Sequence, residues 1–106
     1  MTIKSIDPVA DLPYAKEFME MPVGRHSPNL QRILRFMRSE AATEKPCLLI
    51  LEPGRKWALV RLGGPGEEHV VSMNRIYTDE FEAERDVFAR RWLKLTGQDL
   101  HEALSK

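Results

Sequence analysis

Apolar residues recur with a helical period in two long segments of the chain. The first segment begins after Ser27 and Pro28, which are a typical N-cap residue and a typical first helical residue. The sequence therefore predicts an amphipathic helix that begins at residue 28. Its apolar residues follow the i, i+3, i+4, i+7 spacing of one helix face and are Leu30, Ile33, Leu34 and Met37.

A second long helix is predicted after Asp79. Asp79 and Glu82 have the spacing of a reciprocal capping box, in which each side chain bonds the backbone N–H of the other residue. Gly97 suits the left-handed conformation that ends many helices, and a last short turn of helix is expected at residues 99–104. The expected apolar stripe consists of Phe81, Phe88, Trp92 and Leu95, widened by Ala83 and Val87.

Between these helices, three short apolar runs predict an antiparallel sheet. Residues 47–51 are five consecutive apolar residues, too few for an ordinary helix, and they favour a central strand that is buried on both faces. Pro53 and Gly54 supply a tight turn into a second strand at residues 57–62. A glycine-rich loop leads to the third strand, marked by Val70, Val71, Met73 and Ile76.

The second strand has two different sides. Its side chains alternate, so Trp57, Leu59 and Arg61 share one side while Ala58, Val60 and Leu62 share the other. We expect the more uniformly apolar second side to face the helices, which leaves Trp57 and Arg61 on the outer face. A large aromatic side chain there is either a cross-strand packing partner or an anchor for docking.

The first 26 residues form an N-terminal arm. Pro8, Pro13, Pro22 and Gly24 interrupt it and leave room for one short helix over residues 13–19. The arm is apolar enough to pack, either on the core of its own chain or on a partner. We expect one domain over residues 1–106 of the α+β class: the arm (1–26), then an α-β-β-β-α core (27–106) in which two amphipathic helices flank a three-stranded antiparallel sheet.

Composition excludes several broad classes. The 106 residues carry 16 basic and 16 acidic side chains, so no global field attracts nucleic acid or an anionic membrane. The single Cys47 excludes an internal disulfide and fits a reducing compartment. The N-terminus lacks the apolar run of a signal peptide, and no segment approaches the length of a membrane span. We therefore expect a cytoplasmic protein that does not enter a membrane.

Candidate chemistry is sparse. The sequence offers no recognisable nucleophile triad or phosphate loop, and His26, His69 and His101 lack metal-ligand spacing. We expect no catalytic residue, no cofactor and no metal in this chain. A small enzyme would instead need a polar cleft with convergent titratable groups.

The only concentration of basic residues consists of Arg25, Arg32, Arg35 and Arg38. They form either a track for nucleic-acid phosphates or a solvated helix face. The predicted order of elements is also that of double-stranded RNA-binding domains. That module, however, presents lysines at the start of its last helix, where this chain has acidic residues. A nucleic-acid-binding module is therefore the alternative interpretation and not the leading one.

Two motifs resemble those of a known family. Residues 24–32, Gly-Arg-His-Ser-Pro-Asn-Leu-Gln-Arg, and residues 76–85, Ile-Tyr-Thr-Asp-Glu-Phe-Glu-Ala-Glu-Arg, continuing to residues 87–91, resemble the small (alpha) subunit of N,N-dimethylformamidase and short stand-alone relatives. The resemblance implies a non-catalytic accessory subunit, because in that family the iron site and the amide-hydrolysing residues belong to the large subunit. The expected partner is a larger protein subunit or a second copy of the chain. The candidate partner-binding residues are Arg25, His26, Arg32, Arg35, Trp57 and Arg61.

Overall fold

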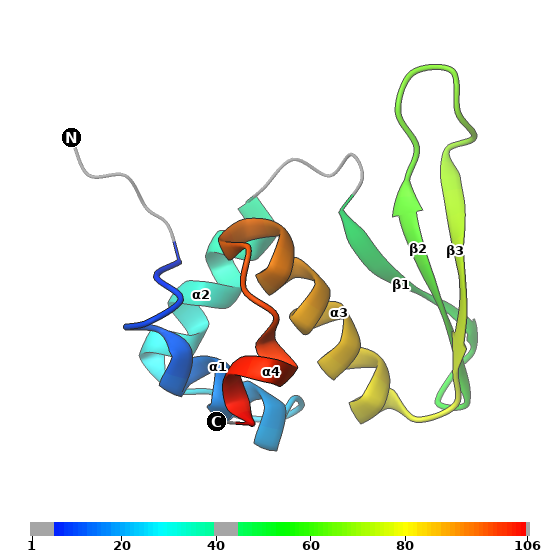
Figure 1. Cartoon of the computed structure of the whole chain (residues 1–106). Helices are drawn as coiled ribbons and strands as arrows, with labels where there is room; N and C mark the ends of the chain where they lie inside the picture. The colour runs from blue at the N-terminus through cyan, green and yellow to red at the C-terminus, as the bar shows by residue number, and fades with distance from the viewer. Residues whose placement is uncertain (1–5, 40–44, 106) are drawn as a thin grey trace.

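The computed structural model of the protein describes residues 6–39 and 45–105, so residues 1–5 of the predicted arm lie outside the described residues. Its elements in chain order are α1 (Leu12–Glu20), α2 (Pro28–Ser39), β1 (Pro46–Glu52), β2 (Lys56–Leu62), β3 (Val70–Tyr77), α3 (Glu80–Thr96) and α4 (Leu100–Leu104). The strands form one antiparallel sheet in the order β1-β2-β3 (Figure 1). The predicted α+β class is confirmed, with α1 in the arm and α4 at the end of the chain.

The ends of α3 follow the predicted capping residues. The Asp79 carboxylate accepts hydrogen bonds from the backbone N–H groups of Phe81 at 2.9 Å and Glu82 at 3.4 Å. Glu82 does not complete the reciprocal box, because its carboxylate lies 3.4 Å from the guanidinium of Arg75 on β3. Gly97 closes the helix in the left-handed conformation at φ +77°. The sequence thus located both ends of α3 correctly.

The prediction that residues 47–51 form the central, doubly covered strand is wrong. These residues belong to β1, an edge strand, and β2 is the central strand. Leu49, Ile50 and Leu51 are 45%, 60% and 44% exposed. Two short hairpins force the middle strand of the sequence into the middle of the sheet, so an apolar run cannot by itself identify a central strand.

The predicted orientation of β2 is also wrong. Trp57 is only 7% exposed and Leu59 is fully buried, and both pack with Tyr77 and with Ala83 and Val87 of α3. The side that carries Trp57 therefore faces the helix. Alternation separates the two sides of a strand but does not state which side is covered, and the small Ala83 leaves room on α3 for the large indole ring.

The helices build a second hydrophobic cluster of their own. α3 contacts all three strands, whereas the apolar stripe of α2 packs mainly against the other helices and not on the sheet as predicted. Phe81 is largely exposed and is not part of the buried stripe of α3. The described part of the arm packs on its own chain, because Ile6 and Phe18 are buried in this cluster. Its other buried members include Leu30, Ile33, Met37, Phe88, Trp92 and Leu100.

A polar network joins β3 to α3 at the edge of the sheet. The Tyr77 hydroxyl donates a hydrogen bond to the Asp86 carboxylate. Asp86 also lies 3.2 Å from the guanidinium of Arg90 and 3.6 Å from that of Arg75. Burial raises the pKa of Tyr77 to about 12, and the hydrogen bond to the Asp86 carboxylate adds to this effect.

Replacing Tyr77 with Phe should lower the free energy of unfolding at neutral pH by about 2 kcal/mol, the usual contribution of a hydrogen bond to a charged acceptor. Because the folded-state pKa of Tyr77 is raised from 10.0 to about 12, the protein should lose stability as pH rises through this interval, in which only the unfolded chain ionises. Urea unfolding of both proteins at pH values across this interval measures the effect. The two stability curves should converge at high pH, and a constant difference would contradict the assignment.

Candidate functional site

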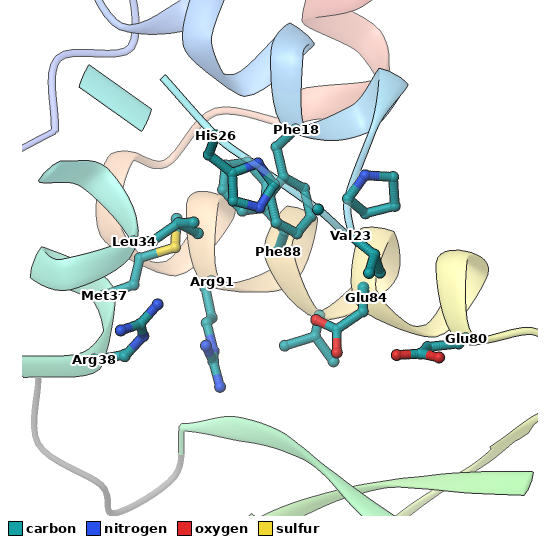
Figure 2. Close-up of a pocket in the computed structure, with 13 residues that line it drawn as sticks. Phe18, Val23, His26, Leu34, Met37, Arg38, Glu80, Glu84, Phe88 and Arg91 are labelled. Carbon is teal, nitrogen blue, oxygen red and sulfur yellow. The ribbon is translucent and has the colours of Figure 1, made fainter. Parts of the chain in front are cut away.

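The two motif segments meet around one cavity of about 340 Å³. Its walls come from α1 and the loop after it, from α2 and from α3 (Figure 2). His26 lies in the first motif segment, and Glu80 and Glu84 lie in the second. We call this space the aromatic cavity, because Phe18 and Phe88 form one of its walls.

Specific hydrogen bonds position the loop that carries His26. Ser27 donates its backbone N–H and its hydroxyl to the two carboxylate oxygens of Glu17, at 2.8 and 2.6 Å. These bonds lower the pKa of Glu17. Gln31 donates to the His26 carbonyl at 2.8 Å, and Gly24 turns the chain with φ +117°, a conformation that residues with a Cβ rarely adopt. Bonds from both α1 and α2 therefore fix the loop.

A stack of rings forms the apolar wall. The Phe18 and Phe88 rings are stacked with centroids 4.2 Å apart, and the His26 ring lies 5.7 Å from Phe18 (Figure 2). Leu34 and Met37 of α2 extend this wall. Phe18, Phe88 and Met37 are themselves buried, so the apolar surface that the cavity presents to another molecule comes from the half-buried Leu34 and the exposed Val23.

Several polar groups of the aromatic cavity lack hydrogen-bond partners within the described part of the chain, and His26 and Glu84 are among them. The Nδ1 atom of His26 is buried without one. Burial raises the pKa of Glu84, and the neighbouring Glu80 carboxylate adds to this, while Arg91 opposes it. The Arg91 guanidinium is itself bonded to the Pro46 carbonyl, at 3.0 and 2.9 Å. His26 and Glu84 therefore keep hydrogen-bonding capacity for another molecule.

A second cavity of about 420 Å³ adjoins the first and shares Gly24, His26, Leu34 and Arg38 with it. Arg25 and Arg35 complete its basic lining, and no acidic side chain of the described residues lines it. Arg35 and Arg38 project from the same side of α2, three residues apart. We call this space the arginine cavity.

The opposite surface of the sheet is apolar and uncovered. Leu49, Ala58 and Ile76 are partners across the three strands and share one face, next to Val60. Figure 1 shows the helices gathered on the other side of the sheet. Ile76 is 56% exposed. Ala58 and Val60 are smaller side chains and lie buried between the larger residues of this face. We call these four residues the outer sheet face.

The structure separates the predicted binding residues into two groups. Arg25, His26 and Arg35 come together around the two cavities. Three others have different surroundings: Arg32 forms a 2.7 Å ion pair with the buried Asp11, Arg61 binds Glu67 through two hydrogen bonds of 3.0 and 2.7 Å, and Trp57 is buried under α3. The Arg61 hydrogen bonds and the Gly64 N–H hold the pKa of Glu67 at about 2.

Sequence reasoning missed several contributors to these surfaces. The pattern predicts Arg38 only as part of a basic helix face, and it does not single out Phe18 or Glu84 as candidate binding residues. The outer sheet face was missed because the orientation of β2 was reversed. One feature of the sequence does point to this site. Glu80 and Glu84 lie four residues apart, where two negative charges repel each other on a helix, and an unfavourable pair of this kind indicates a role in binding.

The polar side chains that line the aromatic cavity are those of His26, Arg38, Glu80, Glu84 and Arg91. No serine, threonine or cysteine is among the described residues that line the aromatic cavity. Within residues 6–39 and 45–105, no group of three or more histidine, cysteine or acidic side chains could hold a metal ion. No described helix is both long and apolar enough to cross a membrane.

Replacing Glu17 with Ala should loosen the His26 loop, because the Ser27 N–H and hydroxyl lose their acceptor. The amides of Ser27 and Leu30 should exchange with solvent about tenfold faster, as expected for the loss of a hydrogen bond to a charged group. Hydrogen exchange followed by NMR measures this. Glu20→Ala is the matched control, since Glu20 ends the same helix and is exposed. Equal exchange in the two variants would contradict the proposed role of Glu17.

Replacing Glu84 with Gln should stabilise the protein by about 0.5 kcal/mol at neutral pH, a small value because solvent still screens this partly exposed carboxylate. The raised pKa of Glu84 means that ionisation costs more in the folded state than in the unfolded chain. This cost appears as pH rises through the unfolded-state value of 4.5 and disappears below it. Thermal unfolding should therefore show equal stability of wild type and variant in acid, and an unchanged difference there would contradict the expectation.

Comparison with known proteins extends the similarity beyond the two motifs. The family model described as N,N-dimethylformamidase alpha subunit matches residues 2–103, which includes all but the first residue of the arm and all but the last residue of α4. Among individually curated proteins, none matches the chain.

Proposed function

The chain belongs to the N,N-dimethylformamidase alpha-subunit family, and on this premise we propose that it is a non-catalytic accessory subunit that binds a larger chain of an amide hydrolase. The family description itself names a subunit, so an association with another chain is part of what membership implies. The outer sheet face is the structural observation that carries the proposal.

Several properties of the outer sheet face suit a stable subunit contact. Leu49, Ala58 and Ile76 form an apolar row across all three strands. Permanent interfaces are more apolar than the remaining surface of a protein, and charged residues are depleted at their centre. Exposed apolar patches on soluble proteins commonly mark such contacts. The larger chain would bury this row and remove it from water.

The electrostatics favour a protein partner over nucleic acid. Arg32 is already paired with Asp11, which interrupts the basic track predicted along α2. Glu80 and Glu84 line the cavity that adjoins the remaining arginines, and they would repel a phosphate backbone. The alternative of a nucleic-acid-binding module therefore has less support.

The proposal is tested by co-expressing the tagged full chain with the large dimethylformamidase-type chain of the same genome. We expect the two chains to elute together in gel filtration and the complex to hydrolyse a formamide. Ile76→Asp should reduce recovery of the large chain at least about tenfold, because a charge placed in an apolar contact loses its hydration. Mass spectrometry of the eluted fractions measures the recovery.

Leu93→Asp is the matched control, because Leu93 is an apolar residue of α3 that is 50% exposed. Both variants should keep the circular dichroism spectrum of the wild type. Elution of the wild-type chain alone would contradict the proposal, and so would self-association through this face in place of binding to the large chain.

A further inference from the structure

We propose that the aromatic cavity and the arginine cavity together bind an extended peptide segment of the larger chain, with a carboxylate side chain in the arginine cavity and a large apolar side chain in the aromatic cavity. This inference rests on the proposed function for the source of the peptide. It assigns a second contact, on the helical side of the molecule, in addition to the outer sheet face.

The arginine cavity determines the charge of the ligand. Arg25, Arg35 and Arg38 line it, and none of them forms an ion pair within the described part of the chain. A guanidinium group presents paired N–H donors that match the two oxygens of a carboxylate. Unpaired arginines that converge on one concave space therefore favour an acidic side chain as the occupant.

The aromatic cavity determines the apolar part of the ligand. The stacked Phe18 and Phe88 rings, 4.2 Å apart, are buried behind this space, so the apolar surface that a ligand side chain meets is that of the half-buried Leu34 and of Val23, which is 38% exposed. The half-buried Glu84 carboxylate lines the same space without a hydrogen-bond partner in the described residues, and His26, whose Nδ1 atom is buried without one, lines it too. The backbone N–H groups of an extended peptide are suitable donors for the carboxylate oxygens of Glu84. A free fatty chain or hydrocarbon would leave these atoms unpaired.

The two cavities are close enough for one short segment. His26 and Leu34 line both of them, so the cavities adjoin at these residues. An extended chain advances about 3.3 Å per residue, and two neighbouring residues can therefore occupy adjoining spaces. The ligand needs its acidic and apolar residues within one or two positions of each other.

A protein segment suits this combination better than a polyphosphate. Glu80 and Glu84 line the far side of the aromatic cavity, and a ligand that carries negative charge along its whole length would meet them (Figure 2). A peptide carries its charge at one position and is neutral beside it. The mixed lining therefore selects against nucleic acid as well as for a peptide.

The test is an NMR titration of the full, isotope-labelled chain with acetylated and amidated peptides. The probes are Ala-Glu-Phe-Ala and Ala-Glu-Ala-Phe-Ala, each added up to about 10 mM because short peptides bind weakly. We expect at least one of them to shift the amides of Gly24, His26, Leu34 and Phe88. Replacing Glu with Gln in the bound peptide, or Phe with Ala, should weaken binding about tenfold.

Variants of the chain connect binding to the two cavities. Arg35→Gln with Arg38→Gln should weaken the peptide at least about tenfold, since each removes a charge-assisted hydrogen bond. His26→Phe keeps an aromatic ring against Phe18 but removes the nitrogen, and it should weaken binding a few-fold. Ile76→Asp, on the outer sheet face, should leave peptide binding unchanged. Thermal unfolding of every variant confirms that it is folded.

Three results would overturn the inference: no shift at the highest peptide concentration, shifts confined to the outer sheet face, or tighter binding of a short RNA duplex than of either peptide. These results are independent of the proposed function, which the co-elution experiment tests separately. If the large chain co-elutes but the peptides do not bind, only the inference about the cavities fails. If the peptides bind but the large chain does not co-elute, the proposed function fails and the peptide site remains.

Discussion

The whole structure depends on α3, because this one helix is buried against two different cores. Ala83 and Val87 pack against the sheet with Trp57 and Tyr77, whereas Phe88, Ala89 and Trp92 pack among the other helices. A small chain cannot bury a sheet and a helical cluster separately, since each alone has too little apolar surface. α3 joins them, and the remaining elements are arranged around it.

Polar contacts from α3 fix the elements that it joins. Arg85 donates to the Met19 carbonyl at the end of α1 at 2.6 Å, and Arg91 donates to the Pro46 carbonyl at the start of β1. Along the chain these arginines look like residues that complement the helix dipole. In the fold they satisfy backbone carbonyls of distant elements, and they hold the arm and the edge strand in place.

The same arrangement explains where the molecule can bind another. Because α3 and the other helices occupy one side of the sheet, the opposite face stays open although its residues are apolar. Because α1 and α2 approach α3 at an end held by Glu17 and Ser27, a concave space with His26 and Glu84 remains between them. Packing a small chain around one helix thus leaves two surfaces that a single partner chain could cover.

The elements, their order, the caps of α3 and the family all follow from the amino-acid sequence alone. These features depend on local chemistry. A serine or aspartate accepts a backbone N–H that has no partner within the helix, a glycine tolerates positive φ, and apolar residues recur at a regular spacing. Tertiary structure alone decided that β1 is an edge strand, that Trp57 faces α3, and that Arg38 and Glu84 line the cavities beside His26. Alternation along a strand is symmetric, so it cannot say which side a helix will cover. A helical period likewise cannot say which distant residues will meet. The covered side of a strand and the contacts between distant residues both depend on long-range packing.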